Sequence, residues 1–247
     1  MKRSHIYLIS IMFIIVLWMV LALVINHSLL LPTPFVVFKS LVSILTSSDS
    51  LIIILYTTLR LLGAIFFSSI LAIFLGILSG FSKKAEAFIK PYITILRTIP
   101  VISIVVIMLI LFGFIWTPYL ITFFMVFPII YQATYQGIIS IDHELIDVYH
   151  LEKHNRLLSI KLFYLPSITK YIYLSFLQSF GLGIKVLVMA EYLSQTKNSI
   201  GNAIYLSKVN LKYDVIFAWT ILLIILSVMI EYFIQKALAK VNEKNLN

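Results

Sequence analysis

The 247-residue sequence contains no cysteine, and only 12% of its residues are charged. Without cysteine the chain forms neither a disulfide framework nor a thiolate metal site. The sequence also lacks HExxH, GxSxG, Walker A and GxGxxG motifs, so it has no recognisable peptidase, hydrolase or nucleotide-binding chemistry of its own. We therefore expect no catalytic residue, no metal site and no bound cofactor on this chain.

Long apolar runs dominate what is present. Apolar residues make up 61% of the chain and its mean hydropathy is +1.04. Several runs reach the roughly 20 residues needed to cross a bilayer as a helix, and they are too long for barrel strands. The sequence predicts an all-α, polytopic integral membrane protein with about six transmembrane helices in a single domain, 1–247. The expected spans are 6–26, 51–80, 91–114, 119–139, 167–193 and 213–235, with a tight outer turn at Trp116 and Pro118 between the third and the fourth.

The basic residues predict the orientation of these spans. The chain begins MKRSH, and the apolar run that follows is too long for a signal peptide, so we expect an uncleaved first span. Twelve of the 19 Lys and Arg residues fall on one side of the six-span arrangement, four on the other and three within spans. This excess predicts that both termini are cytoplasmic. It also accounts for the net charge of +9 without a nucleic-acid partner.

Residues 33–46 are apolar but too short to span a membrane. Thr33 is a good helix cap, and Pro34 suits the first helical position because its missing N–H has no partner there. We expect an interfacial helix on the outer side, with a packed loop helix out of lipid contact as the alternative. The expected apolar stripe is Phe38, Leu41, Val42 and Leu45.

Charged residues gather in the stretch 142–166, between two apolar runs. Asp142 can cap a short helix whose first turn carries Glu144. Asn155 can cap a second one, and Pro166 opens the next span. The first helix would have an apolar edge suited to docking on a partner, although an ordinary polar loop is the alternative. That edge is formed by Leu145, Val148 and Tyr149, and the second helix carries Leu158, Leu162 and Leu165.

The order of residues in this stretch, from LIDVYH through Arg156 to the Leu165–Pro166 pair, resembles the cytoplasmic coupling loop of bacterial ABC importer permeases. The branch it is most similar to is the nitrate, sulfonate and taurine type of these binding-protein-dependent systems. Asp147 stands at the acidic position of that loop. The chain departs from the family pattern where it has Val148 and Tyr149 in place of alanines and Lys153 in place of a glycine.

Two further segments are similar to the same family. The family's third helix carries an arginine, a proline and a later Phe-Gly pair, which are matched by Arg97, Pro100 and Phe112–Gly113. Its fifth helix ends in Ala-Glu before a glycine-bearing loop, matched by Ala190–Glu191 and Gly201. The resemblance covers most of the chain from Leu51 onward.

The resemblance implies a transport subunit and not an enzyme. Two copies would form the path for a small solute in the bacterial cytoplasmic membrane, with an extracytoplasmic binding protein delivering the solute. Two separate ATPase subunits, which hold ATP and Mg, would grip the coupling loops. A stand-alone secondary transporter or channel is the first alternative, and a membrane-embedded enzyme is the second. The residues expected to contact the ATPases are Asp142, Glu144, Leu145, Asp147, Val148, Tyr149, Lys153, Arg156, Leu165 and Pro166.

Charges within spans are the remaining candidates for function, because each is costly at the bilayer centre. Lys185 and Glu191 lie six residues apart, on different faces of one helix, so each needs a partner elsewhere. We expect the translocation path to include Arg97, Pro100, Lys185 and Glu191, with snorkelling to an interface as the alternative for Arg60 and Arg97. Gly76 and Gly80 are expected at a helix contact. His150 and His154 have metal-ligand spacing but no third ligand nearby, so we expect no metal there.

Overall fold

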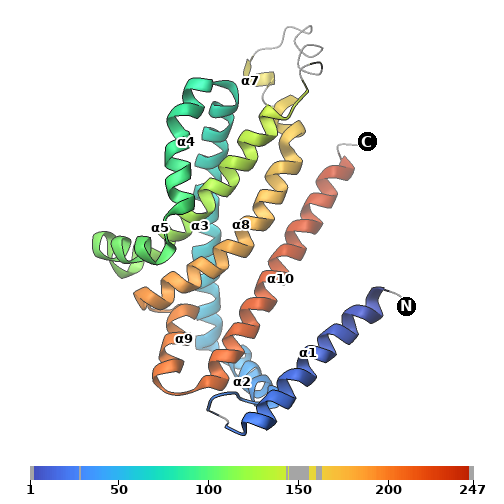
Figure 1. The fold of residues 1–247 in the computed structure, drawn as a ribbon, viewed down its shortest axis with the longest axis vertical. Helices are drawn as coiled ribbons and strands as arrows, with labels where there is room; N and C mark the ends of the chain where they lie inside the picture. Colours follow the sequence, from blue (N-terminus) through green and yellow to red (C-terminus); the bar gives the residue numbers. More distant parts are fainter. Residues whose placement is uncertain (1–2, 28, 143, 145–155, 160–162, 245–247) are drawn as a thin grey trace.

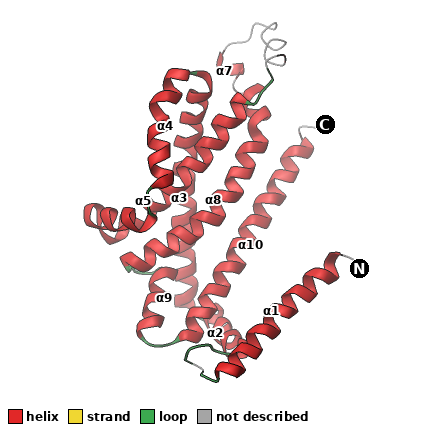
Figure 2. Ribbon diagram, viewed as in Figure 1, coloured by secondary structure: helices red, strands yellow, loops and turns green. Residues whose placement is uncertain are grey.

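The computed structural model describes the chain except residues 1–2, 28, 143, 145–155, 160–162 and 245–247 (Figure 1). The described residues form helices joined by short loops, with no strand among them (Figure 2). Five of these helices are long and apolar enough to cross a membrane, which confirms an all-α, polytopic membrane protein. They are α1 (Arg3–Ile25), α3 (Ser48–Phe81), α5 (Val101–Ile139), α8 (Leu165–Ser194) and α10 (Tyr213–Lys244).

The helix α2 (Pro34–Thr46) begins at the proline that the sequence indicated. Thr33 is its N-terminal cap residue, but the Thr33 side chain makes no capping hydrogen bond. The residues that α2 buries are Val37, Leu41 and Ile44, whereas Phe38, Val42 and Leu45 of the expected stripe are exposed. The helix packs against α10 and α3, and α1 splays away from the other long helices (Figure 1).

The centre of the structure is formed by α3, α5 and α8, which run side by side (Figure 1). Two glycines let α3 approach α5 closely. A Cβ on Gly76 would lie 2.7 Å from Thr134 Cβ, and one on Gly80 would lie 2.7 Å from Ile138 Cγ2. Both glycines therefore lie against another helix of the same chain.

The structure divides the predicted span 91–114 differently. A helix already begins at Lys83, where the Ser82 hydroxyl accepts a hydrogen bond from Ala85 N, and this helix, α4 (Lys83–Thr98), includes Pro91. It ends because Pro100 disfavours helical backbone at the preceding residue, and Ile99 is extended, with ψ 133°. Residues 101–114 belong instead to α5, so the part of the chain that the structure describes contains five helices with the length to span.

The expected outer turn at Trp116 and Pro118 lies inside α5. The break occurs earlier, at Gly113, whose φ of 72° and ψ of −174° suit only glycine. The first part of α5 consequently bends away from the second (Figure 1). Pro118 has no N–H to donate to the carbonyl of Phe114, and the Thr196 hydroxyl donates to that oxygen at 2.7 Å instead.

The two ends of the bundle differ. At one end, called the loop end here, α5 leads into the segment 140–164, which contains α7 (Arg156–Ser159). At the other end α8 stops at Gln195, which is left-handed with φ 49°. Ser199 then caps α9 (Ile200–Val209) by accepting a hydrogen bond from Asn202 N at 3.0 Å, and α9 packs against α8 and α10.

Candidate functional site

Opposite charges meet inside the bundle near the α9 end. Glu191 of α8 is 0% exposed and Arg60 of α3 is 8% exposed. Arg60 Nη1 lies 3.1 Å from Glu191 Oε1, so the two charges neutralise each other within the protein. Arg60 therefore does not snorkel to an interface, and Glu191 has a partner on another helix.

Hydrogen bonds complete this cluster, which we call the Arg60–Glu191 brace. The Thr57 hydroxyl contacts both carboxylate oxygens of Glu191 at 3.1 Å, and Gly201 N donates to Oε2 at 3.2 Å. The Arg60 guanidinium also donates to two carbonyls of the loop before α9, those of Lys197 and Asn198, at 3.1 and 3.0 Å. The brace thus joins α3, α8 and the start of α9 through bonds in which charged groups take part.

Gly201 makes this docking possible, because α9 touches α8 backbone to backbone there. A Cβ on Gly201 would lie 2.5 Å from Val188 O and 2.5 Å from Glu191 Cβ. Such distances leave no room for a side chain. The sequence pointed to Glu191 and Gly201 separately but did not pair Glu191 with Arg60; two opposite charges within apolar spans were the available signal.

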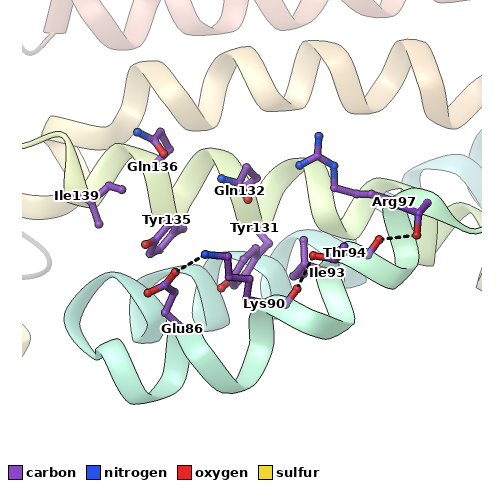
Figure 3. Close-up of a pocket in the computed structure, with 11 residues that line it drawn as sticks. Glu86, Lys90, Ile93, Thr94, Arg97, Tyr131, Gln132, Tyr135, Gln136 and Ile139 are labelled. Carbon is purple, nitrogen blue, oxygen red and sulfur yellow. Dashed lines mark hydrogen bonds and ion pairs between the residues drawn. The ribbon is translucent and has the colours of Figure 1, made fainter.

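A polar cavity of about 590 Å³ lies between α4 and the second part of α5 (Figure 3). From α4 it is lined by Glu86, Lys90 and Arg97, and Lys90 Nζ lies 3.4 Å from Glu86 Oε1. From α5 it is lined by polar residues that include Gln132 and Gln136. The sequence pointed to Arg97 alone; the recurrence of polar residues at helical spacing on both segments could have indicated the cavity.

Lys185 occupies a different place from Glu191. It is exposed on the single chain and borders an apolar groove of about 550 Å³ between α8, α9 and α10. No ion pair or hydrogen bond of Lys185 occurs among the described residues. Pro100 is also exposed and precedes the first turn of α5. The four residues expected together on one path are therefore not brought together within one chain.

The expected coupling loop is described only in part. Asp142 and Glu144 are exposed at the loop end, Arg156 begins α7, and Leu165 and Pro166 form the first turn of α8. Burial of Tyr164, just before α8, raises the pKa of its phenol. The described residues contain no group of three potential metal ligands. Leu145, Asp147, Val148, Tyr149, His150, Lys153 and His154 lie outside the described residues.

Comparison with known proteins identifies the class. Residues 68–244 match the family described as binding-protein-dependent transport system inner membrane component. The chain is also 25% identical over 225 residues to a putative aliphatic sulfonates transport permease protein, SsuC, of Bacillus subtilis (strain 168). That alignment covers 90% of this chain and 81% of the relative.

The family match includes α4, α5, the loop end, α8, α9 and all of α10, which are the elements that build both the polar cavity and most of the brace. Membership accounts for the absence of recognisable catalytic motifs, since the family consists of transport permeases. It also agrees with the five apolar helices of a multi-pass protein of the bacterial cytoplasmic membrane. The chain belongs to the family of binding-protein-dependent transport system inner membrane components, and it is a permease of the ABC importer type.

Proposed function

We propose that the chain is the membrane-spanning subunit of an ATP-driven importer and that two copies enclose the solute path. An extracytoplasmic binding protein delivers the solute, and two ATPase subunits, which hold ATP and Mg, drive the cycle. The family match across residues 68–244 carries this proposal, because such systems use separate proteins for these tasks. Aliphatic sulfonates, which the name of the relative mentions, are the first solutes to test.

The segment 142–166 is the proposed site of ATPase docking. It joins α5 to α8, two of the three central helices, so a force applied to it reaches the packed centre of the bundle directly. The Lys and Arg distribution supports a cytoplasmic position for this segment and for both termini. A stand-alone channel or secondary transporter would need no such segment.

Residues of the solute path are proposed on the same basis. Arg97 and Pro100 lie where α4 gives way to α5, and Lys185 is an exposed charge on α8. A second copy would cover exposed charges at bilayer depth, whereas lipid would not tolerate them well. Glu191 contributes by holding α8 against α3, since its charge is already neutralised by Arg60.

Substitution of Tyr149 by Asp tests the docking segment. A carboxylate on the apolar edge of the segment should weaken docking in a partner groove, so less ATPase should co-purify or hydrolysis should no longer depend on the solute. The measurements are co-purification with a co-expressed Walker A ATPase and ATPase activity in reconstituted complexes with candidate binding proteins.

Leu211→Asp is the matched control, because it places the same charge in an exposed turn at the α9 end. Leu211 has φ 56°, a conformation that Asp adopts more readily than Leu, so the control should fold normally. Wild-type co-purification and coupling in Tyr149→Asp would exclude this segment as the docking site.

A further inference from the structure

The cavity between α4 and α5 combines two polar helix faces. From α4, the polar positions 86, 90, 94 and 97 recur at intervals of three or four residues, and from α5 the polar positions 135 and 136 follow position 132 by three and four residues. Each set therefore lies on one side of its helix. Arg97 lies 14 residues beyond the start of α4, or about 21 Å along the helix axis. Arg97 is exposed in the single chain, and its charge requires water or a counter-charge, either of which the cavity can hold.

The charges in this cavity do not cancel. Glu86 and Lys90 form an ion pair at 3.4 Å near one end. Arg97, near the other end, has no ion-pair or hydrogen-bond partner among the described residues. Lys90 lies seven residues away from Arg97, about 10 Å along α4, and is occupied by Glu86. The guanidinium is therefore an unneutralised positive charge within a cavity large enough for a small solute.

Some hydrogen-bond donors that line the cavity already have an acceptor within the protein, whereas others do not. The hydroxyls of Thr94 and Thr98 donate to backbone carbonyls of α4, and the Tyr131 hydroxyl donates to Ser79 Oγ. Their protons are therefore in use. The side-chain amides of Gln132 and Gln136 have no hydrogen-bond partner among the described residues.

The side chains of Arg97, Gln132 and Gln136 also lie on the same side of the cavity (Figure 3). Figure 3 shows the guanidinium of Arg97 extending from the end of α4 toward Gln132, with Gln136 on the same side of α5. A charged donor and two neutral donors thus line the same cavity from two different helices, with Arg97 and Gln136 exposed and Gln132 half-buried in the single chain.

We propose that Arg97, with Gln132 and Gln136, forms a binding site for a small oxyanion, such as a sulfonate, carboxylate or phosphate group. The planar guanidinium presents paired N–H donors that match two oxygens of such a group, and the amides supply further donors. A cation would meet uncompensated positive charge there. The site gives the permease a recognition step of its own, in addition to selection by a delivering protein.

Two sources of such a group are chemically equivalent: the head of a transported solute and the phosphate of a lipid. Assignment to a transported solute rests on the function proposed above, whereas the oxyanion site itself does not. The test therefore has one arm for each source.

The first arm uses the full-length permease in nanodiscs of phosphatidylcholine, with 2,2,2-trifluoroethanesulfonate as the probe. Transverse relaxation of its fluorine signal should increase with wild-type protein and should be reversed by excess ethanesulfonate but not by choline. Arg97→Gln should lower the increase at least fivefold, because it removes the charge, and Arg97→Lys should retain part of it. Lys84→Gln is the matched control, since it removes an exposed positive charge from α4 outside the cavity and should leave the increase unchanged.

The second arm measures phospholipid retained after purification in detergent, by mass spectrometry. Retention of an anionic phospholipid that is lost in Arg97→Gln but kept in Lys84→Gln, without probe binding, would support the oxyanion site and assign it to lipid. Equal relaxation in wild-type and Arg97→Gln protein, together with equal lipid retention, would overturn the proposal. The segment proposed for ATPase docking, 142–166, does not include Arg97. Failure of the wild-type permease to associate with an ATPase would therefore count against the proposed function. Normal association together with a failed probe test would count against the oxyanion site alone.

Discussion

Removing the guanidinium of Arg60 should destabilise the permease strongly. Arg60→Met keeps an unbranched apolar stem but leaves Glu191, which is 0% exposed, without its counter-charge. It also leaves the carbonyls of Lys197 and Asn198 without the donors that now hold the start of α9. Breaking one partner of a buried pair costs about 3–5 kcal/mol.

The structure indicates why the cost falls in that range and not above it. Glu191 would retain the Thr57 hydroxyl and Gly201 N as donors, so its carboxylate would not be stripped of every partner. For a chain of this size each kcal/mol lowers the melting temperature by about 2–4 °C, so Arg60→Met should melt about 6–20 °C lower.

Thermal melting followed by fluorescence-detected size exclusion measures this shift. The double variant Arg60→Met with Glu191→Gln removes both charges and retains an oxygen for Thr57 and Gly201, so it should recover much of the loss. A melting temperature of Arg60→Met within 2 °C of wild type would refute the reasoning. So would a double variant as unstable as the sum of its single changes, because the two sites would then be independent.

Two further changes test the packing of α5. Gly76→Ala should lower the free energy of unfolding by about 1–3 kcal/mol, because its Cβ would lie 2.7 Å from Thr134 Cβ. The control Gly63→Ala meets nothing closer than 4.0 Å and should be neutral or stabilising. Equal melting temperatures of the two variants would exclude a tight contact at Gly76. Thr196→Val should cost about 1–3 kcal/mol, because Phe114 O loses the donor that replaces the missing N–H of Pro118. The control Thr220→Val removes an exposed hydroxyl bonded within its own helix and should melt like wild type; a shift as large as that of Thr196→Val would contradict the special role of Thr196.

Hydropathy was sufficient to predict most of the long helices, because a bilayer imposes the same length and apolarity on each of them. The second and fifth predicted spans, 51–80 and 167–193, lie within a few residues of α3 and α8. Hydropathy could not divide the region 91–118 correctly. The apolar run continues through Ile99–Pro100 and past Gly113, and the breaks depend on backbone conformations that side-chain polarity does not report.

The candidate site was less predictable because its contacts are non-local. The sequence indicated that Glu191 needed a partner, but Arg60 lies 131 residues away along the chain and could be selected only with the helices placed side by side. Arg97 stood out through its charge. The glutamines opposite it, being neutral, became significant only when α4 and α5 were seen to share a cavity.

The separation between Arg60 and Glu191 also affects how the protein is made. A ribosome adds about 5–20 residues per second, so α3 emerges about 7–26 s before the carboxylate that neutralises its arginine. On insertion scales an arginine at a helix centre costs about 2.5–3.5 kcal/mol, which the many apolar residues of α3 outweigh. The newly made span therefore enters the bilayer with an uncompensated charge. Once α8 and the following loop have been made, Arg60 pairs with Glu191, and this ion pair joins α3 to α8.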